Sequence, residues 1–367
     1  MINRSRPIRI LTHLLRTRKI PHAMLFTGID GVGRYRTAIR FAMALNCTKT
    51  PKDSFNSGGK RTFEDIEDTD SWPVCGTCPA CKKIQAGGHP DILHIRPTGN
   101  AIKIADIRSL GDILALKPYE AFYRFAILEN AQAMTLSAAN ALLKMLEEPP
   151  AGTTLVLIAN KSSDLLSTII SRCQHVRFPP LPEEQIVHSI IATSEDISPE
   201  AAHIIAAMAG GSDQAAREAA SAKWIRQRGW LINELDRMPT NTASFTKGIP
   251  RRILAMADML THDPQQLSKL LGIIKSWLRD LAVLPFAPER IINRDTVDQM
   301  KPMTSDVSSQ TFISGFEALE KIEKQIQANA NPRLALEIFL IKLAQDISTS
   351  GGLESVENYG ENRRRPV

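Results

Sequence analysis

The sequence has few aromatic residues and no long apolar run. Phe, Trp and Tyr together make up 5% of the 367 residues, so we expect a core built mainly from Leu, Ile, Ala and Val. No apolar run reaches the roughly 18 residues that a membrane helix needs. The segment Met1–Arg6 has neither the apolar core nor the cleavage site of a secretory signal. These absences predict a cytoplasmic protein with no membrane partner.

Cysteine is scarce and odd in number. Five cysteines in a compartment expected to be reducing do not indicate a disulfide framework. Cys75, Cys78 and Cys81 lie in CxxC spacing, and Cys47 ends the helix expected after a glycine-rich turn. Four thiolates complete the tetrahedral shell of zinc with no open position, so we predict a structural zinc site, with a redox CxxC pair or buried thiols as alternatives. Cys173 stands apart and is expected to pack as a small apolar residue.

The charge balance permits an anionic partner without requiring one. The net charge is +6 and the isoelectric point about 9.1, which suits a nucleic-acid partner or simply a solvated basic surface. A stand-alone zinc-containing nucleic-acid binder is therefore one functional alternative. Aromatic and basic residues are not interleaved as base-stacking platforms would require, which speaks against it.

Residues 1–181 alternate short apolar runs with helical patterns. Strands are expected at 23–27, 92–95, 124–128, 154–159 and 174–178, and helices at about 33–46, 105–114 and 137–147. This alternation predicts an α/β fold, a parallel sheet covered on both faces that binds ligands at the carboxyl ends of its strands. The polar stretch 48–74 is expected to be an exposed, mobile insertion.

The remainder of the chain shows helical patterns only. We expect a small helical domain at 182–228, a larger helical domain at 229–349 and a flexible tail at 350–367. Within the larger domain, Gln265–Leu284 places its Leu, Ile and Trp residues on one face. Asn331 followed by Pro332 is typical of a helix start, with an N-cap and proline at the first helical position.

A glycine-rich turn follows the first expected strand and opens a helix. Gly28 and Gly33 have the spacing of GxxxxGK[ST], the loop whose backbone amides cradle phosphates, whose lysine reaches the outer phosphates and whose hydroxyl ligates magnesium. Here Arg34 stands at the lysine position and Tyr35 at the hydroxyl position. Arginine keeps the charge but not the compact shape of lysine, and the tyrosine hydroxyl lies too far out to reach the metal. The alternative is a glycine-rich turn that never bound nucleotide.

A second component of an ATP site is also altered. The strand 125–128 is of the kind that presents one carboxylate to magnesium and another to the attacking water, but it ends in Glu129 and Asn130. The Asn130 amide cannot act as a base. These two defects predict that the chain neither binds nor hydrolyses ATP in its own site.

The stretch Asn140–Pro150 (NALLKMLEEPP) carries a family resemblance. It resembles the signature of bacterial clamp-loader subunits of the gamma/tau and delta-prime kinds, members of the AAA+ class. Ser171-Arg172-Cys173 resembles their SRC motif, and Pro21-His22-Ala23 and the cysteine placement also fit. Trp277–Leu281 is similar to the delta-prime C-terminal domain. The resemblance covers about residues 1–181 strongly and the rest weakly, and the long 48–74 insertion departs from the family.

The resemblance implies roles for particular residues. The SRC arginine, Arg172, would reach the ATP site of the adjacent subunit, although an arginine before a strand can equally be a surface charge. The signature helix would face the central DNA chamber, where Lys144 could approach phosphate or simply be solvated. The family's gamma subunits sense nucleotide with an arginine after a Gly-Ser pair, and Gln214 takes that place here. This third altered position favours the delta-prime kind.

The resemblance therefore implies an AAA+ domain at 1–181 with a degenerate P-loop and a four-cysteine zinc module, a helical lid at 182–228 and a helical collar at 229–349. The expected function is that of a clamp-loader subunit of DNA polymerase III without ATPase activity, which supplies Arg172 to a neighbour and helps load the sliding clamp onto primed DNA. The expected partners are gamma/tau and delta subunits, the clamp, and DNA through the assembled complex. The alternative is an active gamma/tau-type ATPase.

Overall fold

The computed structural model describes residues 6–49, 72–194, 197–238 and 251–357. The chain divides into two compact units, one formed by 1–185 with 211–215 and the other by 186–210 with 216–367. Within the described ranges, no helix combines the length and the apolar character needed to cross a membrane.

The first unit is built on a parallel sheet of five strands in the order β2-β3-β4-β1-β5. All pairs of neighbouring strands are parallel. Their bounds are β1 Ala23–Thr27, β2 Ile92–Ile95, β3 Arg124–Leu128, β4 Thr153–Ala159 and β5 Gln174–Arg177. The five expected strands and the α/β class are confirmed, with boundaries within one residue of those expected.

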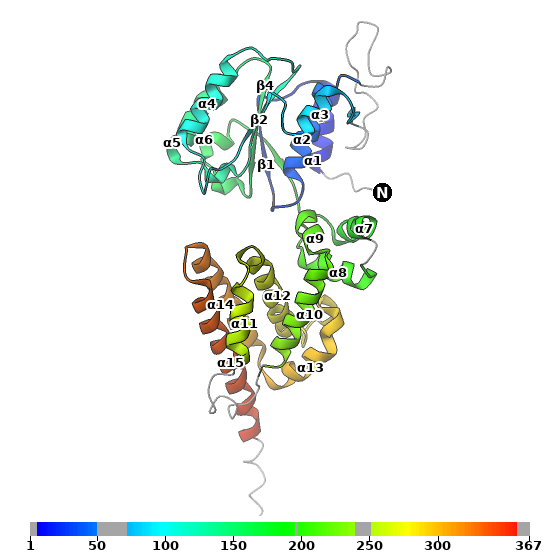
Figure 1. Ribbon diagram of the computed structural model, residues 1–367, viewed down its shortest axis with the longest axis vertical. Coiled ribbons are helices and arrows are strands. Elements are labelled where there is room, and N and C mark those ends of the chain that lie inside the picture. Colours follow the sequence, from blue (N-terminus) through cyan, green and yellow to red (C-terminus); the bar gives the residue numbers. More distant parts are fainter. Residues whose placement is uncertain (1–5, 50–71, 195–196, 239–250, 358–367) are drawn as a thin grey trace, which may run out of the picture. The chain divides into compact units, whose positions relative to one another are not determined.

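Helices cover both faces of this sheet (Figure 1). One face carries α1 (Arg6–Thr17), α2 (Arg34–Asn46) and α3 (Pro79–Gln85), and the other carries α4 (Ile104–Ala115), α5 (Leu136–Glu147) and α6 (Ser167–Ile170). Because side chains alternate across a strand, Met24 and Phe26 of β1 enter the first core while Ala23 and Leu25 enter the second. The turns η2 (Ala131–Ala133) and η3 (Ser162–Asp164) follow β3 and β4.

Trp72 corrects the expectation that the whole of 48–74 is exposed. Its side chain is 2% exposed and packs edge-on against Phe41, with ring centroids 5.7 Å apart. Its indole N–H donates to Thr12 Oγ1 at 3.0 Å, so the polar handle of the ring is satisfied in the core. The part of the expected mobile insertion between 50 and 71 lies outside the described residues.

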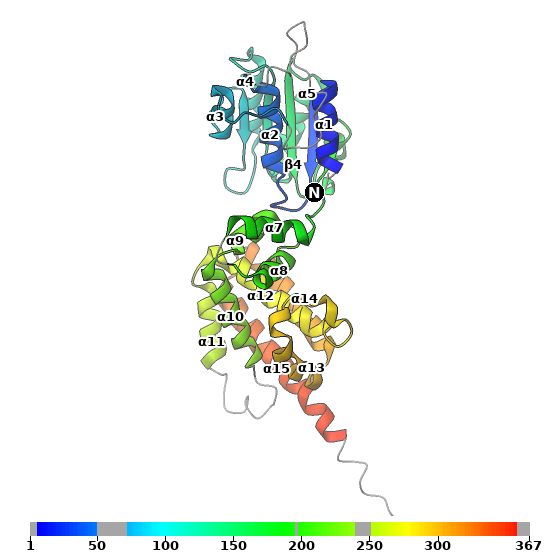
Figure 2. The ribbon, with the colours of Figure 1, turned by 90° about the vertical axis from the view of Figure 1, so that its right-hand side faces the viewer.

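Beyond β5 the described residues are helical, as expected (Figure 2). The helices are α7 Glu183–Thr193, α8 Pro199–Met208, α9 Asp213–Ala219, α10 Ala222–Asp236, α11 Arg251–Thr261, α12 Pro264–Val283, α13 Val297–Asp306, α14 Ser309–Gln327 and α15 Pro332–Glu357, with short turns η5 (Pro288–Arg290) and η6 (Arg294–Thr296). Helix α10 passes without interruption through the expected domain boundary at 228/229. Helix α15 includes the first residues of the expected tail, and residues 358–367 lie outside the described part.

The second unit is organised around α12, which packs against α10 and α14. The apolar face expected for 265–284 is buried, with Ile274, Trp277, Leu278 and Leu281 fully enclosed. Asp280 lies on this helix at 0% exposure, and its carboxylate accepts hydrogen bonds from the backbone N–H groups of Ile292 and Asn293 at 2.7–3.2 Å. A buried carboxylate thereby holds the segment before α13 against the core.

Candidate functional site

The glycine-rich turn lies where the sequence predicts it, between β1 and α2 at the carboxyl edge of the sheet. Gly31 and Gly33 have φ angles of 80° and 89°, which favour glycine. A side chain at Gly31 would also collide with Ser212, because a Cβ there would lie 2.0 Å from Ser212 Oγ. The backbone N–H of Gln214 donates to the Gly31 carbonyl at 3.2 Å, so the altered sensing position lies beside the loop.

Arg34 is folded into its own chain. The side chain is only 6% exposed. Its Nη2 donates to Asp30 Oδ1 at 2.5 Å and to Asn160 Oδ1 at 2.9 Å, and its Nη1 donates to the Ala159 carbonyl. Burial lowers the pKa of the guanidinium, against the opposing effect of Asp30. The backbone N–H of Gly28 is also taken, since it donates to the Asn160 carbonyl at 3.2 Å. The cation and one amide of the loop are therefore engaged within the protein.

Tyr35 and Glu129 belong to a second internal network beside Arg34. The Tyr35 hydroxyl lies 3.0 Å from His94 Nδ1, and the Arg96 guanidinium lies 5.5 Å from the centre of the Tyr35 ring. Arg96 Nε donates to Glu129 Oε1 at 2.7 Å. Burial, reinforced by Glu129, raises the pKa of Tyr35, and the hydrogen bond to Glu129 raises the pKa of Arg96. The acid at the end of β3 thus faces an arginine of the same chain.

Sequence reasoning did not select His94 and Arg96, although a signal was present. Both lie at the carboxyl end of β2, which pairs with β3, and the carboxyl ends of parallel strands meet at one edge of a sheet. Asn130 follows Glu129 in a left-handed conformation, with φ 52°, and starts η2. The structure therefore brings the altered positions Arg34, Tyr35, Glu129 and Gln214 to one edge.

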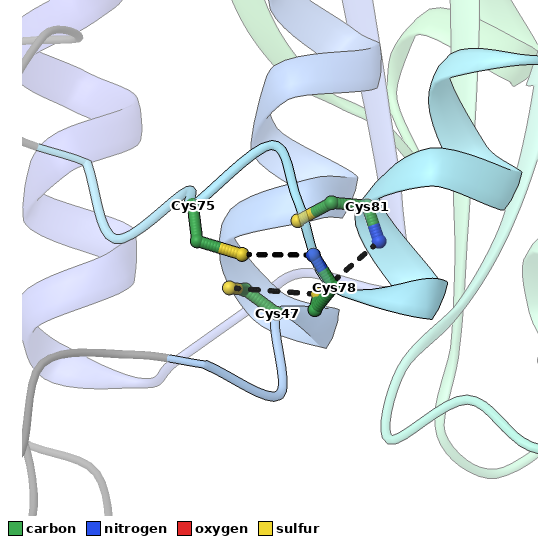
Figure 3. A group of neighbouring side chains, drawn as sticks. All are labelled: Cys47, Cys75, Cys78 and Cys81. Atoms are coloured by element: carbon green, nitrogen blue, oxygen red, sulfur yellow. Dashed lines mark hydrogen bonds between the residues drawn. The ribbon is translucent and has the colours of Figure 1, made fainter.

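The four cysteines selected from the sequence converge on one point (Figure 3). Their Sγ atoms all lie within 4.8 Å of one another, and the Sγ atoms of Cys47 and Cys78 are 4.0 Å apart. Four thiolates around zinc lie about 3.8 Å apart, because Zn–S bonds are about 2.3 Å long and tetrahedral. Cys47 follows α2, and the other three lie before and within α3. The donor set therefore fits a tetrahedral metal.

The environment of the cluster favours thiolate formation at one position and disfavours it at another. Burial opposes ionisation of Cys78, but hydrogen bonds from Thr48 and the Cys81 backbone outweigh it and lower the pKa to about 5. Burial raises the pKa of the Cys81 thiol, and so does its hydrogen bond with Cys78. Cys173 is not part of the cluster, and burial raises its pKa to about 11. Cys173 packs against the second core, as expected.

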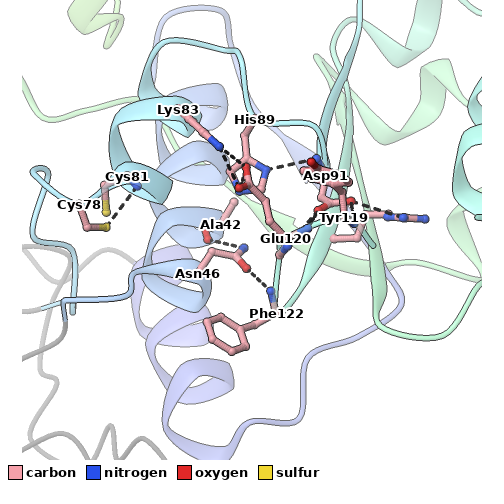
Figure 4. A network of polar contacts seen from close by, with 12 residues as sticks. Ala42, Asn46, Cys78, Cys81, Lys83, His89, Asp91, Tyr119, Glu120 and Phe122 are labelled. Atoms are coloured by element: carbon pink, nitrogen blue, oxygen red, sulfur yellow. Dashed lines mark hydrogen bonds and ion pairs between the residues drawn. The ribbon is translucent and has the colours of Figure 1, made fainter. Parts of the chain in front are cut away.

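A polar network connects the cysteine cluster to the loop before β3 (Figure 4). Asn46, next to Cys47, accepts from the backbone N–H groups of Phe122 and Tyr123 and donates to the Tyr123 and Ala42 carbonyls at 2.9–3.0 Å. Lys83, on α3, donates to Glu120 at 2.8 Å. Both ends of the cysteine module are thus fastened to residues 120–123.

Asp91 holds the same loop from the other side. Its carboxylate is buried and accepts from the backbone N–H groups of Tyr119, Glu120 and Ala121 at 2.8–2.9 Å. Arg124 Nη2 lies 3.4 Å from Asp91 Oδ1. Burial opposes ionisation of Asp91, but the backbone hydrogen bonds and Arg124 lower its pKa overall.

Arg172 lies in the turn between α6 and β5, beside the C-terminal end of α5. Its side chain is 37% exposed, and Nη2 donates to Glu147 Oε1 at 2.7 Å. Lys144 lies about one helical turn before Glu147 on α5 and forms no ion pair among the described residues. The SRC arginine is therefore at the surface and paired with an acid of the Asn140–Pro150 signature.

Comparison with known proteins shows which proteins this chain is similar to. The family model described as "DNA polymerase III, delta subunit" matches residues 3–182. The delta-prime subunit of Bacillus subtilis is 27% identical over 341 residues, which cover 93% of this chain and 96% of the relative. The chain is a relative of bacterial DNA polymerase III delta-prime subunits. The delta-prime subunit of Pseudomonas aeruginosa is 29% identical over 219 residues, covering 59% of this chain and 61% of that protein.

The chain is similar to tau subunits as well. The tau subunit of Bacillus subtilis is 25% identical over 355 residues, which cover 92% of this chain but 59% of tau. Among solved structures, a DNA polymerase III gamma-subunit-related protein of Thermotoga maritima aligns with 92% of this chain and 99% of its own at 20% identity, with a TM-score of 0.47. The relationship to the delta-prime subunits rests on the sequence matches.

Replacing Asp91 by Asn should destabilise the protein by about 3 kcal/mol at neutral pH, because a buried carboxylate held by backbone N–H groups and an arginine is lost. The pKa of Asp91 is lower in the folded protein than in the unfolded chain. Its contribution to the free energy of unfolding is therefore complete above the unfolded-state pKa of about 3.9 and is lost as the pH falls through the folded-state pKa. The difference between wild type and variant should therefore shrink in acid. Urea unfolding at a series of pH values measures it, with the exposed Asp112→Asn as control. If the stability difference between wild type and variant stays constant down to the pH at which the protein unfolds, the charge of Asp91 does not have this role.

Proposed function

We propose that this chain is the delta-prime subunit of a DNA polymerase III clamp loader, with an AAA+-type first unit that neither binds nor hydrolyses ATP. It would supply Arg172 to the ATP site of a neighbouring gamma/tau subunit and help load the sliding clamp onto primed DNA. The sequence similarity to delta-prime subunits supports the clamp-loader role. The helical residues would act as a lid at 182–228 and as an oligomerisation collar at 229–349.

The observation that carries this proposal is the buried Arg34. A working phosphate loop keeps its cation and its amides for the nucleotide. Here the Arg34 guanidinium is bonded to Asp30, Asn160 and the Ala159 carbonyl. Nucleotide binding would have to break these contacts and leave buried polar groups without partners, which is costly. An active gamma/tau-type ATPase does not fit this arrangement.

The surroundings of Glu129 support the same conclusion. In an active site of this kind, the acid at the end of the strand serves magnesium and the attacking water. Here Arg96 holds the Glu129 carboxylate at 2.7 Å, and Tyr35 stands at the metal-ligating position. A guanidinium cannot polarise water as a bound metal does. The site would thus keep the backbone shape of a nucleotide site, while the charges of Arg34 and Glu129 are already paired with other residues of the same chain.

Cys47, Cys75, Cys78 and Cys81 would hold a structural zinc ion. Zinc bound by four thiolates offers no open coordination position, so it would supply stability rather than chemistry. The Asn46 and Lys83 contacts suggest what that stability serves, because they connect the module to residues 120–123 at the start of β3.

The purified chain should contain one zinc ion per molecule, and Cys75→Ser should abolish it, because three remaining thiolates leave the tetrahedral shell open. Metal analysis of protein purified without chelator measures the content. Cys173→Ser is the matched control and should retain zinc, since Cys173 lies outside the cluster. Zinc-free wild-type protein would contradict the assignment.

The isolated chain should show no saturable ATP binding at micromolar concentration and no magnesium-dependent hydrolysis, because its loop cation and its strand-end acid are engaged internally. Isothermal calorimetry and a phosphate-release assay measure this. Micromolar binding with turnover that Arg34→Ala abolishes would instead identify an active ATPase of the gamma/tau type.

Replacing Arg172 by Ala should lower DNA-stimulated ATP hydrolysis by the assembled complex, by up to about 10³-fold at the affected site if the arginine acts on the transferring phosphate. Folding, zinc content and assembly should be unchanged, because an exposed ion pair contributes little to stability. Arg172→Lys should restore little, since a point charge does not reproduce the guanidinium fork.

The control for Arg172→Ala is Arg9→Ala, which removes an exposed arginine from the same unit. It should leave hydrolysis and clamp loading unchanged. If complexes with Arg172→Ala load clamps at the wild-type rate, Arg172 has no role in a neighbour's ATP site and is only a surface charge.

A further inference from the structure

The ion pair between Arg172 and Glu147 has a well-defined geometry. The guanidinium is held at both ends, because Nη2 donates to Glu147 Oε1 at 2.7 Å and Nη1 donates to the Thr168 carbonyl at 3.0 Å. Glu147 is the last residue of α5, whereas Thr168 belongs to α6. Both side chains remain open to solvent, at 37% exposure for Arg172 and 51% for Glu147.

The backbone around each partner is held without the ion pair. The Arg172 N–H donates to the Ile169 carbonyl at 3.1 Å, and Ile169 is fully buried. On α5, the Glu148 N–H donates to the Lys144 carbonyl at 3.0 Å, and Leu146 is 2% exposed. The two elements therefore stay in place if the pair separates, and only the side chains are free to change partners.

A carboxylate resembles a phosphate as a partner for arginine, because both accept from the planar guanidinium fork. Glu147 thus offers Arg172 the same kind of contact that a nucleotide phosphate would offer. A phosphate carries more negative charge and more acceptor oxygens than a carboxylate. An exposed ion pair such as this one can therefore be exchanged for a phosphate contact at small cost.

We propose that Glu147 is a positioning residue that holds Arg172 within its own chain and releases it when the neighbouring subunit presents a nucleotide phosphate. This inference rests on the proposed role of Arg172 in a neighbour's ATP site. Glu147 would lower the fraction of subunits whose guanidinium is available before that phosphate is presented. Its effect should then be largest on hydrolysis in the absence of DNA, because fewer arginines are engaged in that state.

Glu148 provides a matched control. It follows Glu147 directly and is exposed, and it makes no ion pair among the described residues. Glu148→Gln removes the same charge one residue away from the contact. A difference between Glu147→Gln and Glu148→Gln therefore reports the contact rather than the local charge.

The first measurement uses the isolated chain and does not depend on any partner. Phenylglyoxal modification of Arg172, followed by mass spectrometry, reports how accessible the guanidinium is. Glu147→Gln should accelerate this modification about two- to fivefold, the range expected for an exposed ion pair, and Glu148→Gln should match wild type. Equal rates in wild type and Glu147→Gln would overturn the holding contact.

The second measurement uses the complex assembled with its gamma/tau and delta partners. Without DNA, Glu147→Gln should raise ATP hydrolysis by about the same factor of two to five, and it should have no effect in combination with Arg172→Ala. A decrease caused by Glu147→Gln, or an increase that persists in the Arg172→Ala background, would overturn the proposal. If Arg172→Ala alone leaves hydrolysis unchanged, the trans-acting role fails, while the modification rates still decide whether Glu147 holds Arg172.

Discussion

A buried guanidinium must find acceptors, because an unpaired charge in the interior is costly. Arg34 finds them on two neighbouring segments of its own chain: Asp30 in the glycine-rich turn, and the Ala159 carbonyl and the Asn160 side chain at the end of β4. These contacts draw the turn after β1 onto the end of β4, its neighbour in the sheet. The glycine-rich turn is thereby tied to the end of β4 by hydrogen bonds.

The same principle operates one strand further along the edge. Glu129 ends β3 as a carboxylate that needs a positive partner, and Arg96 at the end of β2 provides one. The Tyr35 ring lies beside Arg96 and bonds to His94, so the bulky residue at the metal-ligating position is itself part of the packing. The charges of Arg34 and Glu129 are thus both paired with other residues of the same chain.

The cysteine module and the end of the signature helix lie at the opposite edge of the sheet, where β3, β4 and β5 begin, and they have different roles. Asn46 and Lys83 fasten the module to the loop before β3 through hydrogen bonds, and the Asp91 carboxylate holds the same loop. The Asn46 and Asp91 side chains are buried, so this arrangement resists movement because buried polar groups must stay paired. Arg172 and Glu147 are joined through solvent-exposed side chains, where an exchange of partners costs little. The first unit therefore contains both a firmly held cysteine module and an exposed ion pair whose partners can be exchanged.

The sequence by itself determined the α/β class, the five strands, the bounds of the helices at 33–46, 105–114 and 137–147 to within one residue, the convergence of the cysteines and the family resemblance. These depend on local periodicity, on glycine and proline positions, and on spacings within short segments, which a linear pattern contains. The burial of Trp72, the self-pairing of Arg34, and the His94 and Arg96 contacts were decided by the tertiary structure. They join residues from different strands and helices, so they depend on strand order. A polar stretch around Trp72 or an isolated arginine such as Arg96 looks like surface until the chain brings a buried neighbour or an opposite charge beside it.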